Sequence, residues 1–215
     1  MNSRLHYRAA LTFVVHLQLD TLMENLRLCR GDSTRSKDMV PGLMIRLNKD
    51  QECYDFLKWW ATISKNLQYD WDDETLPYLG IKNANLLEPI DPFLLETSSE
   101  LFFVVMHHQP HLAHTVALTL VKIKLYFIFL ATHGTNGAYE TATERYRKIM
   151  DEMVELRDST IARNPHVANL TCFEAQPEIQ KAKAQIRKLY EIANKINRYF
   201  WQELIDPDES LNSAP

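Results

Sequence analysis

Glycine is scarce in this sequence of 215 residues, with only five copies. A sandwich or barrel of many short strands needs frequent turn residues, so this scarcity argues against an all-β fold. The three cysteines, Cys29, Cys53 and Cys172, are far apart and form no Cys-x-x-Cys pair, which excludes a zinc ribbon and a thioredoxin-type redox motif. A scattered, odd set of cysteines fits reduced thiols in an intracellular protein, cytoplasmic or nuclear.

The chain also lacks the short motifs of the common enzyme classes. No Walker loop, G-x-G-x-x-G fingerprint, G-x-S-x-G elbow or H-E-x-x-H helix occurs in it. The most apolar stretch, residues 116–132, is interrupted by Lys122 and Lys124, so we interpret it as a buried helix and not as a membrane span. These absences favour a protein without enzymatic activity and without a cofactor.

What is present is typical of a globular protein: 46% of the residues are hydrophobic and 24% are charged. The formal net charge of −4 gives no general attraction to nucleic acid. The N-terminal region contains Arg4 and Arg8 but no acidic residue before Asp20, so a targeting segment is one interpretation. Because the apolar pattern continues without a break past this region, we favour a helix of the folded domain.

Hydrophobic residues recur at spacings of three and four along most of the chain, which is the period of an α-helix. Leu11, Val15, Leu19, Leu22 and Leu26 form the first such stripe. The pattern predicts six helices, over residues 4–29, 38–47, 49–64, 111–133, 138–162 and 177–204.

The fold class expected from this pattern is all-α. Residues 1–205 are expected to form one domain, and the acidic residues 206–215 a disordered tail. Asn164-Pro165 ends the fifth predicted helix, and Ser36 or Asp38 is expected to cap the second, because short polar side chains satisfy the free amides of a first turn.

The second and third predicted helices form a helical hairpin with a predicted shared core. Leu43, Leu47, Phe56 and Trp60 lie on the facing stripes of the two helices. The adjacent Trp59 points about 100° away from Trp60 on a helix, so the two rings cannot both face one partner. We favour burial of both tryptophans within the chain over exposure of one in a binding groove.

The stretch LRLCRGDSTRSKDMVPGLMIRLNKDQECYDFLKWW, residues 26–60, and the stretch TLPYLGIKNANLLEPIDPF, residues 75–93, resemble a group of uncharacterised fungal proteins associated with MYND-type zinc-finger proteins. The likeness covers residues 20 to about 125, and the hairpin within it also resembles a tetratricopeptide (TPR) unit. The likeness to the fungal group implies no activity, whereas the likeness to a TPR unit implies an array of helical hairpins that binds other proteins. The chain has no cysteine-rich finger, so no zinc-finger function is implied. Because the TPR signature does not recur at its period of about 34 residues, an irregular bundle is the alternative architecture.

A long connection without helical period is predicted over residues 66–105, where Pro77, Gly80, Pro89 and Pro92 occur. Long irregular segments on a helical frame commonly carry binding groups. The first part of this connection combines aromatic and acidic side chains, which suit a protein or peptide partner with basic character. The predicted partner-binding residues are Tyr69, Asp70, Trp71, Asp72, Asp73 and Glu74.

Two other clusters predict alternative functions. His107, His111 and His114 have the spacing of one helical face, so they are candidate ligands of a metal site in an α-helical enzyme. No acidic residue lies within this cluster, and Pro110 interrupts it, so we expect that it holds no structural metal.

The second cluster is a basic stripe, Lys181, Lys188 and Lys195, at seven-residue spacing on the last long helix. It is a candidate nucleic-acid surface, or an internal partner for the acidic residues 70–74. A solvated helix face is the interpretation we favour. The sequence therefore favours a non-enzymatic helical module that binds a protein, with the metal site and the nucleic-acid surface as alternatives.

Overall fold

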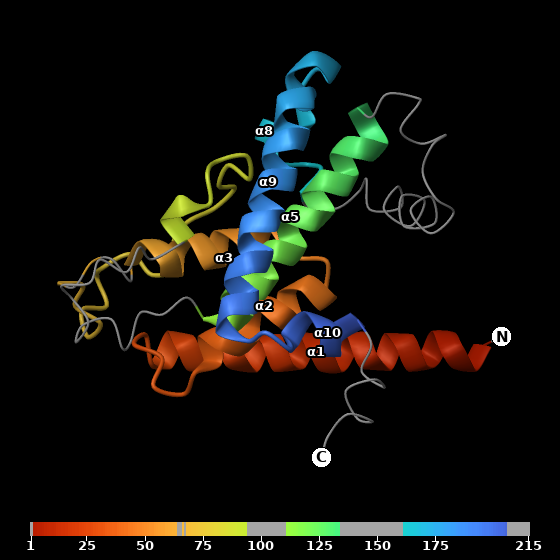
Figure 1. The fold of residues 1–215 in the computed structure, drawn as a ribbon. Helices are drawn as coiled ribbons and strands as arrows, with labels where there is room; N and C mark the ends of the chain where they lie inside the picture. Colours follow the sequence, from red (N-terminus) through yellow and green to blue (C-terminus); the bar gives the residue numbers. More distant parts are fainter. Residues whose placement is uncertain (1, 64–65, 67, 94–110, 134–160, 206–215) are drawn as a thin grey trace.

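The computed structural model describes residues 2–63, 66, 68–93, 111–133 and 161–205. Within these ranges the chain forms seven α-helices, one short 3-10 helix and no strand, which confirms the predicted all-α class. The elements are α1 (Asn2–Leu28), α2 (Ser36–Arg46), α3 (Asp50–Ile63), η1 (Asp91–Phe93), α5 (Leu112–His133), α8 (Pro165–Ala168), α9 (Cys172–Ile196) and α10 (Phe200–Ile205) (Figure 1).

The predicted hairpin is present as α2 and α3, which pack on each other and are joined by residues 47–49. The sequence predicted that Ser36 or Asp38 caps the first helix, α2, but neither side chain does so. The carboxylate of Asp32 accepts hydrogen bonds from the backbone amides of Ser36 (2.7 Å) and Lys37 (3.1 Å). Because Asp32 lies four residues before the helix, the loop and not the helix supplies the cap.

The predicted core of the hairpin is confirmed. Phe56 and Trp60 are buried in the main hydrophobic cluster, and Leu43 and Leu47 pack against that cluster while partly exposed. Trp59 is buried as well, so both adjacent tryptophans lie inside the molecule. The helix turns their rings in different directions, and the fold supplies apolar neighbours for each.

Helix α5 is the central element of the fold. It packs against α9, α2 and α3, and no residue between 111 and 130 is exposed. Within the described residues, Leu112–Leu130 is the one helical window with the length and apolar composition of a membrane span. Here neighbouring helices cover this window, as expected for the helix at the centre of a core.

The C-terminal helices differ from the prediction. The helix expected over 177–204 begins at Cys172, because Thr171 and Glu174 form a capping box in which each side chain accepts the other residue's backbone amide. Pro177 therefore lies inside α9, in its second turn, and not at its start. At Asn197 the backbone is extended, so α9 ends there and α10 is a separate short helix.

The fifth predicted helix, 138–162, lies outside the described residues except at its end. Residues 161 and 162 belong to a turn, and the short helix α8 follows, with Asn164 as its cap. The predicted tail, 206–215, and the second part of the long connection, 94–105, also lie outside the described residues. The described part of that connection is irregular except for η1, as predicted.

Candidate functional site

The acidic loop, residues 69–74, is held by Arg30, which follows the end of α1. One guanidinium nitrogen of Arg30 donates to the carbonyl oxygens of Asp73 (2.9 Å) and Leu76 (3.3 Å). The other donates to the carbonyl oxygen of Glu74 (3.1 Å). A planar guanidinium with several fixed donors is well suited to this task. Arg30 therefore fixes the backbone of the loop through carbonyl oxygens and not through its carboxylates.

Aromatic stacking fixes the same loop as well, next to Arg30, which lies 5.2 Å from the centre of the Tyr78 ring. The ring of Trp71 stacks on that of Trp60 with centroids 5.8 Å apart, and its edge meets Tyr69 at 4.8 Å. Trp59 contacts Tyr69 at 6.1 Å and Tyr78 at 4.9 Å. We call these five residues the aromatic cluster. Tyr69 and Trp71, both predicted to bind a partner, are thus half-buried and attach the loop to α3.

The acidic side chains of the loop have a different environment. Asp70, Asp72 and Glu74 are exposed, and Asp73 is half-buried. Asp73 accepts hydrogen bonds from the hydroxyl group (2.6 Å) and the backbone amide (2.8 Å) of Thr75, and these bonds lower the pKa of its carboxyl group. The loop therefore presents fixed negative charge to solvent at neutral pH.

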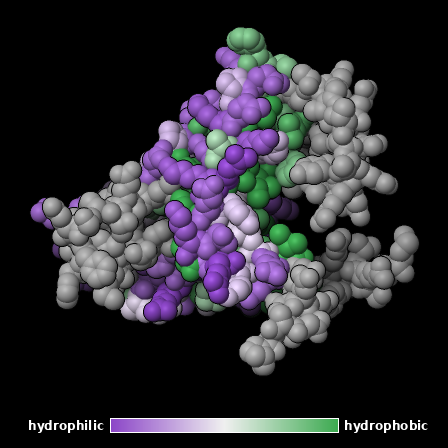
Figure 2. Space-filling model, in the orientation of Figure 1, coloured by the Kyte–Doolittle hydropathy of each residue, from purple (hydrophilic) through white to green (hydrophobic). Residues whose placement is uncertain are grey.

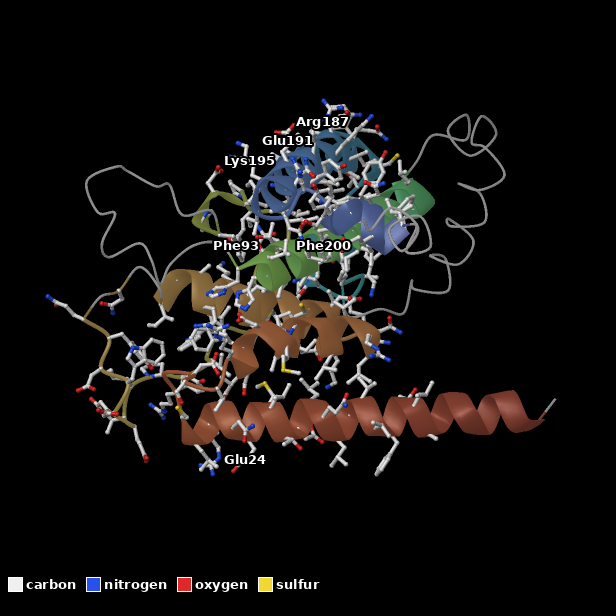
Figure 3. All side chains as sticks on the ribbon, turned by 60° about the horizontal axis from the view of Figure 1, so that its bottom comes forward. Glu24, Phe93, Arg187, Glu191, Lys195 and Phe200 are labelled. Carbon is white, nitrogen blue, oxygen red and sulfur yellow. The ribbon has the colours of Figure 1, made fainter. Side chains whose placement is uncertain are left out.

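The acidic loop does not pair with the basic stripe of α9 in the described part of the chain. Lys188 binds Asp91 at 2.8 Å, and Lys181 binds Glu178 on its own helix at 2.7 Å. Lys195 lies on the outer side of α9 together with Arg187 and Glu191 (Figure 3). The outward side of this helix is largely hydrophilic in Figure 2, as expected for a solvated face.

The structure describes two of the three histidines that were metal candidates, since His107 lies outside the described residues. His111 Nδ1 is 3.4 Å from Asp38 Oδ1, and His114 Nε2 is 3.9 Å from the same oxygen. His114 Nε2 donates to the carbonyl oxygen of Lys37 at 3.0 Å, and burial lowers the pKa of His114 to about 4. Burial also lowers the pKa of His111. In the described ranges no group of three or more His, Cys, Asp or Glu side chains is arranged to hold a metal ion.

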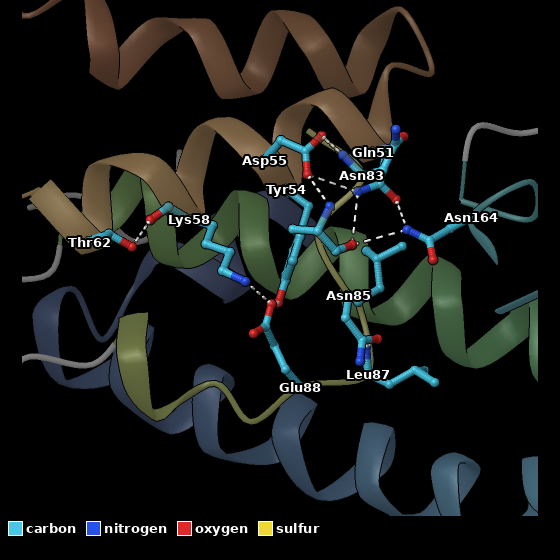
Figure 4. Close-up of polar contacts among 12 residues, drawn as sticks. Gln51, Tyr54, Asp55, Lys58, Thr62, Asn83, Asn85, Leu87, Glu88 and Asn164 are labelled. Carbon is cyan, nitrogen blue, oxygen red and sulfur yellow. Dashed lines mark hydrogen bonds and ion pairs between the residues drawn. The ribbon is translucent and has the colours of Figure 1, made fainter. Parts of the chain in front are cut away.

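A buried polar network connects α3 to the irregular segment that follows the acidic loop (Figure 4). Asp55 accepts hydrogen bonds from the backbone amides of Asn83 and Ala84, each at 2.8 Å, and from the side-chain amide of Gln51 at 3.0 Å. Gln51 in turn accepts a hydrogen bond from Asn164 at 2.7 Å. Asn83 has a left-handed φ of 52°, so this turn is fixed in an uncommon backbone conformation by a single carboxylate.

A second polar set lies next to this network. Glu88 accepts hydrogen bonds from Lys58 (2.6 Å) and from the hydroxyl group of Tyr54 (3.1 Å) (Figure 4). The ammonium group of Lys122, fully buried on α5, donates to the carbonyl oxygen of Leu86 at 2.5 Å and lies 5.5 Å from the centre of the Tyr54 ring. These contacts tie the segment 83–88 to both α3 and α5. The network and this set have structural roles.

Lys122 should make stability depend on pH in the mildly alkaline range. Burial lowers its pKa to about 8 from the ordinary 10.5, against the attraction of Glu88 and Glu178. Between these values the unfolded chain binds more protons than the folded one, so the free energy of unfolding rises with pH there. From pH 7 to pH 9 this effect should contribute about 1 kcal/mol.

The test is urea denaturation of the parent and of Lys122→Met at both pH values. We expect the free energy of unfolding of the parent, minus that of the variant, to increase by about 1 kcal/mol when the pH is raised from 7 to 9. The variant is needed because burial also raises the pKa of Cys53, which lowers stability in the same range. An identical pH dependence of the two proteins would mean that Lys122 keeps an ordinary pKa.

Comparison with known proteins adds no assignment, because no protein family, curated protein or solved structure matches the chain. The site therefore depends on its own geometry. Sequence reasoning missed Arg30, whose role depends on contacts with carbonyl groups 43 to 46 residues away. It also missed Asp55 and Asn164, since a buried polar residue on a helix has no distinct local pattern.

Proposed function

We propose that the protein is a non-enzymatic, intracellular helical module that binds a basic segment of another protein through the acidic loop. The observation that carries this proposal is the fixation of the loop by two sets of contacts, the hydrogen bonds of Arg30 and the stacking of the aromatic cluster, with three carboxylates left exposed. The resemblance of the α2–α3 hairpin to a TPR unit fits the same proposal.

The physical advantage of such an arrangement is preorganisation. A mobile acidic segment must lose conformational entropy when it binds, whereas this backbone is already ordered by tertiary contacts. Exposed carboxylates on an ordered backbone attract lysine and arginine side chains, and the attraction is screened by salt. The proposed partner is therefore a lysine- or arginine-rich peptide, bound more tightly at low ionic strength.

The two alternative functions have less support. His114 already donates its Nε2 proton to a backbone carbonyl group, which leaves that nitrogen unavailable to a metal. In the basic stripe, Lys181 and Lys188 are each neutralised by a nearby carboxylate, which weakens any attraction to nucleic acid.

The prediction concerns removal of the acidic charges. Replacing Asp70, Asp72, Asp73 and Glu74 together by serine should weaken binding of a lysine-rich fluorescent peptide by about tenfold at low salt, because several charge pairs are lost at once. Fluorescence anisotropy measures the affinity, with a glutamate-rich peptide of equal length as the comparison ligand. Raising the salt concentration to about 0.5 M should remove most of the difference between parent and variant.

A charge-matched control separates a local effect from one of net charge. Asp20, Glu24, Glu191 and Glu203 are exposed acidic residues on helices, and their joint replacement by serine changes the net charge equally. This control should retain parental affinity for the lysine-rich peptide. Equal affinity of the loop variant and the parent at low salt, with circular dichroism unchanged, would reject the acidic loop as the binding surface.

A further inference from the structure

The N-terminal half of α1 exposes an unusual amount of apolar surface. Phe13 is 69% exposed, Leu17 57%, Val14 48% and Leu11 41%. The neighbouring helix α2 has 11 residues against 27 in α1, so α1 is longer by about 24 Å at a rise of about 1.5 Å per residue. Val15 is the first residue of α1, among those with described side chains, that is buried by the rest of the protein.

The exposed residues lie toward the outside of the molecule. Helix α1 runs along one edge of the structure, with the other described helices on one side of it (Figure 1). Glu24 points away from these helices (Figure 3). Leu17 and Phe13 precede Glu24 by seven and eleven residues, which places them on nearly the same face of the helix. None of the other described helices therefore covers the outer face.

The width of the apolar arc distinguishes between possible occupants. At about 100° per residue, Leu11, Val14, Leu17 and Phe13 are spread over roughly 160° of the helix circumference. A single partner helix contacts a narrower seam than this. A helix partly immersed in the boundary of a lipid bilayer is surrounded by apolar material over such an arc.

The distribution of charge along the chain also favours a lipid bilayer as the occupant. All 28 acidic residues of the chain lie at or after Asp20, whereas Arg4 and Arg8 lie before it. The first 19 residues therefore carry positive charge in a chain whose net charge is −4. A positively charged segment attracts the anionic headgroups of a bilayer.

We propose that the N-terminal half of α1 docks, parallel to the surface, on a lipid bilayer that contains anionic phospholipids. Phe13, Val14 and Leu17 enter the boundary between headgroups and acyl chains, and Arg4 and Arg8 supply attraction to the phosphates. The acidic residues 20 and 24 mark the end of the inserted region. This surface is separate from the acidic loop, so the protein could hold a basic partner at a membrane.

The experiment is co-sedimentation of the full chain with phosphatidylcholine vesicles that contain about 30% phosphatidylserine. We expect binding to these vesicles and much weaker binding to phosphatidylcholine alone. Phe13→Ser with Leu17→Ser should reduce the partition coefficient by about tenfold or more, because both side chains leave water on docking. Arg4→Gln with Arg8→Gln should remove the preference for the anionic vesicles.

The chain offers a control of identical composition. Phe173, 89% exposed on α9, and Leu204, 55% exposed on α10, lie on other helices, and Phe173→Ser with Leu204→Ser should bind vesicles like the parent. Equal loss in this control, or no binding of the parent to anionic vesicles, would overturn the proposal. So would a concentration-dependent dimer that forms without lipid and is abolished only by the Phe13 and Leu17 changes, since a second copy would then cover the face.

Discussion

Asp55→Ala is expected to lower the free energy of unfolding by about 3–5 kcal/mol. The carboxylate of Asp55 is buried and accepts hydrogen bonds from two backbone amides and one side-chain amide. The variant leaves the backbone amides of Asn83 and Ala84 without this acceptor, and the amide of Ala84 is buried, where water cannot replace the lost bond. The turn at Asn83 also loses the group that holds its left-handed backbone.

The effect should be local to this network and measurable by urea denaturation. Asp72→Ala, which changes an exposed acidic residue, should alter stability by less than about 0.5 kcal/mol. Gln51 shares the network, so the effects of Asp55→Ala and Gln51→Ala should not add in a double-mutant cycle. Additive effects would mean that the two side chains stabilise the fold independently.

The periodic helices could be predicted from the sequence because each buries one apolar stripe. The predicted ranges 38–47 and 111–133 correspond to α2 (Ser36–Arg46) and α5 (Leu112–His133). The failure at α9 has a local cause: Pro177 was taken as the first residue of the helix, whereas Thr171 and Glu174 form the capping box six residues earlier. A proline in the second turn of a helix removes one hydrogen bond near an exposed end, which the helix tolerates here.

Individual burial was harder to predict than helix position. Leu11 lies on the first predicted apolar stripe, yet it is 41% exposed. A stripe says which face of a helix is apolar, but the length of the neighbouring helix determines how much of that face is covered. For α1 the cover ends near Val15, because α2 is short.

The candidate site could be predicted only in part. Its residues were identified by composition, and the exposed positions of Asp70, Asp72 and Glu74 fit that interpretation. The sequence could not show that the aromatic residues of the loop attach it to α3 while the acidic residues stay exposed. Trp71 is fixed by stacking on Trp60, a contact between distant residues that no local pattern encodes. The same holds for Asp38, which supplies the acidic neighbour of His111 and His114 from a different helix.

Phe56→Ala is the second change with a large expected effect, a loss of about 3–5 kcal/mol in the free energy of unfolding. The ring of Phe56 is buried on α3 and lies 6.2 Å from the ring of Trp60 and 6.3 Å from that of His114, measured between centroids. It therefore joins the helical hairpin to the start of α5. Truncation removes buried apolar area and leaves a cavity between elements that cannot fully close.

The matched control for this change is Phe173→Ala, because Phe173 is the same residue type in an exposed position. Thermal and urea denaturation should show a large loss for Phe56→Ala and a change below about 0.5 kcal/mol for Phe173→Ala. A variant of Phe56 that melts within a degree or two of the parent would contradict the packing of α3 against α5 at this point. Intrinsic tryptophan fluorescence gives a second measure, since the ring contacts Trp60 directly and its removal should change the emission of that side chain in the folded state.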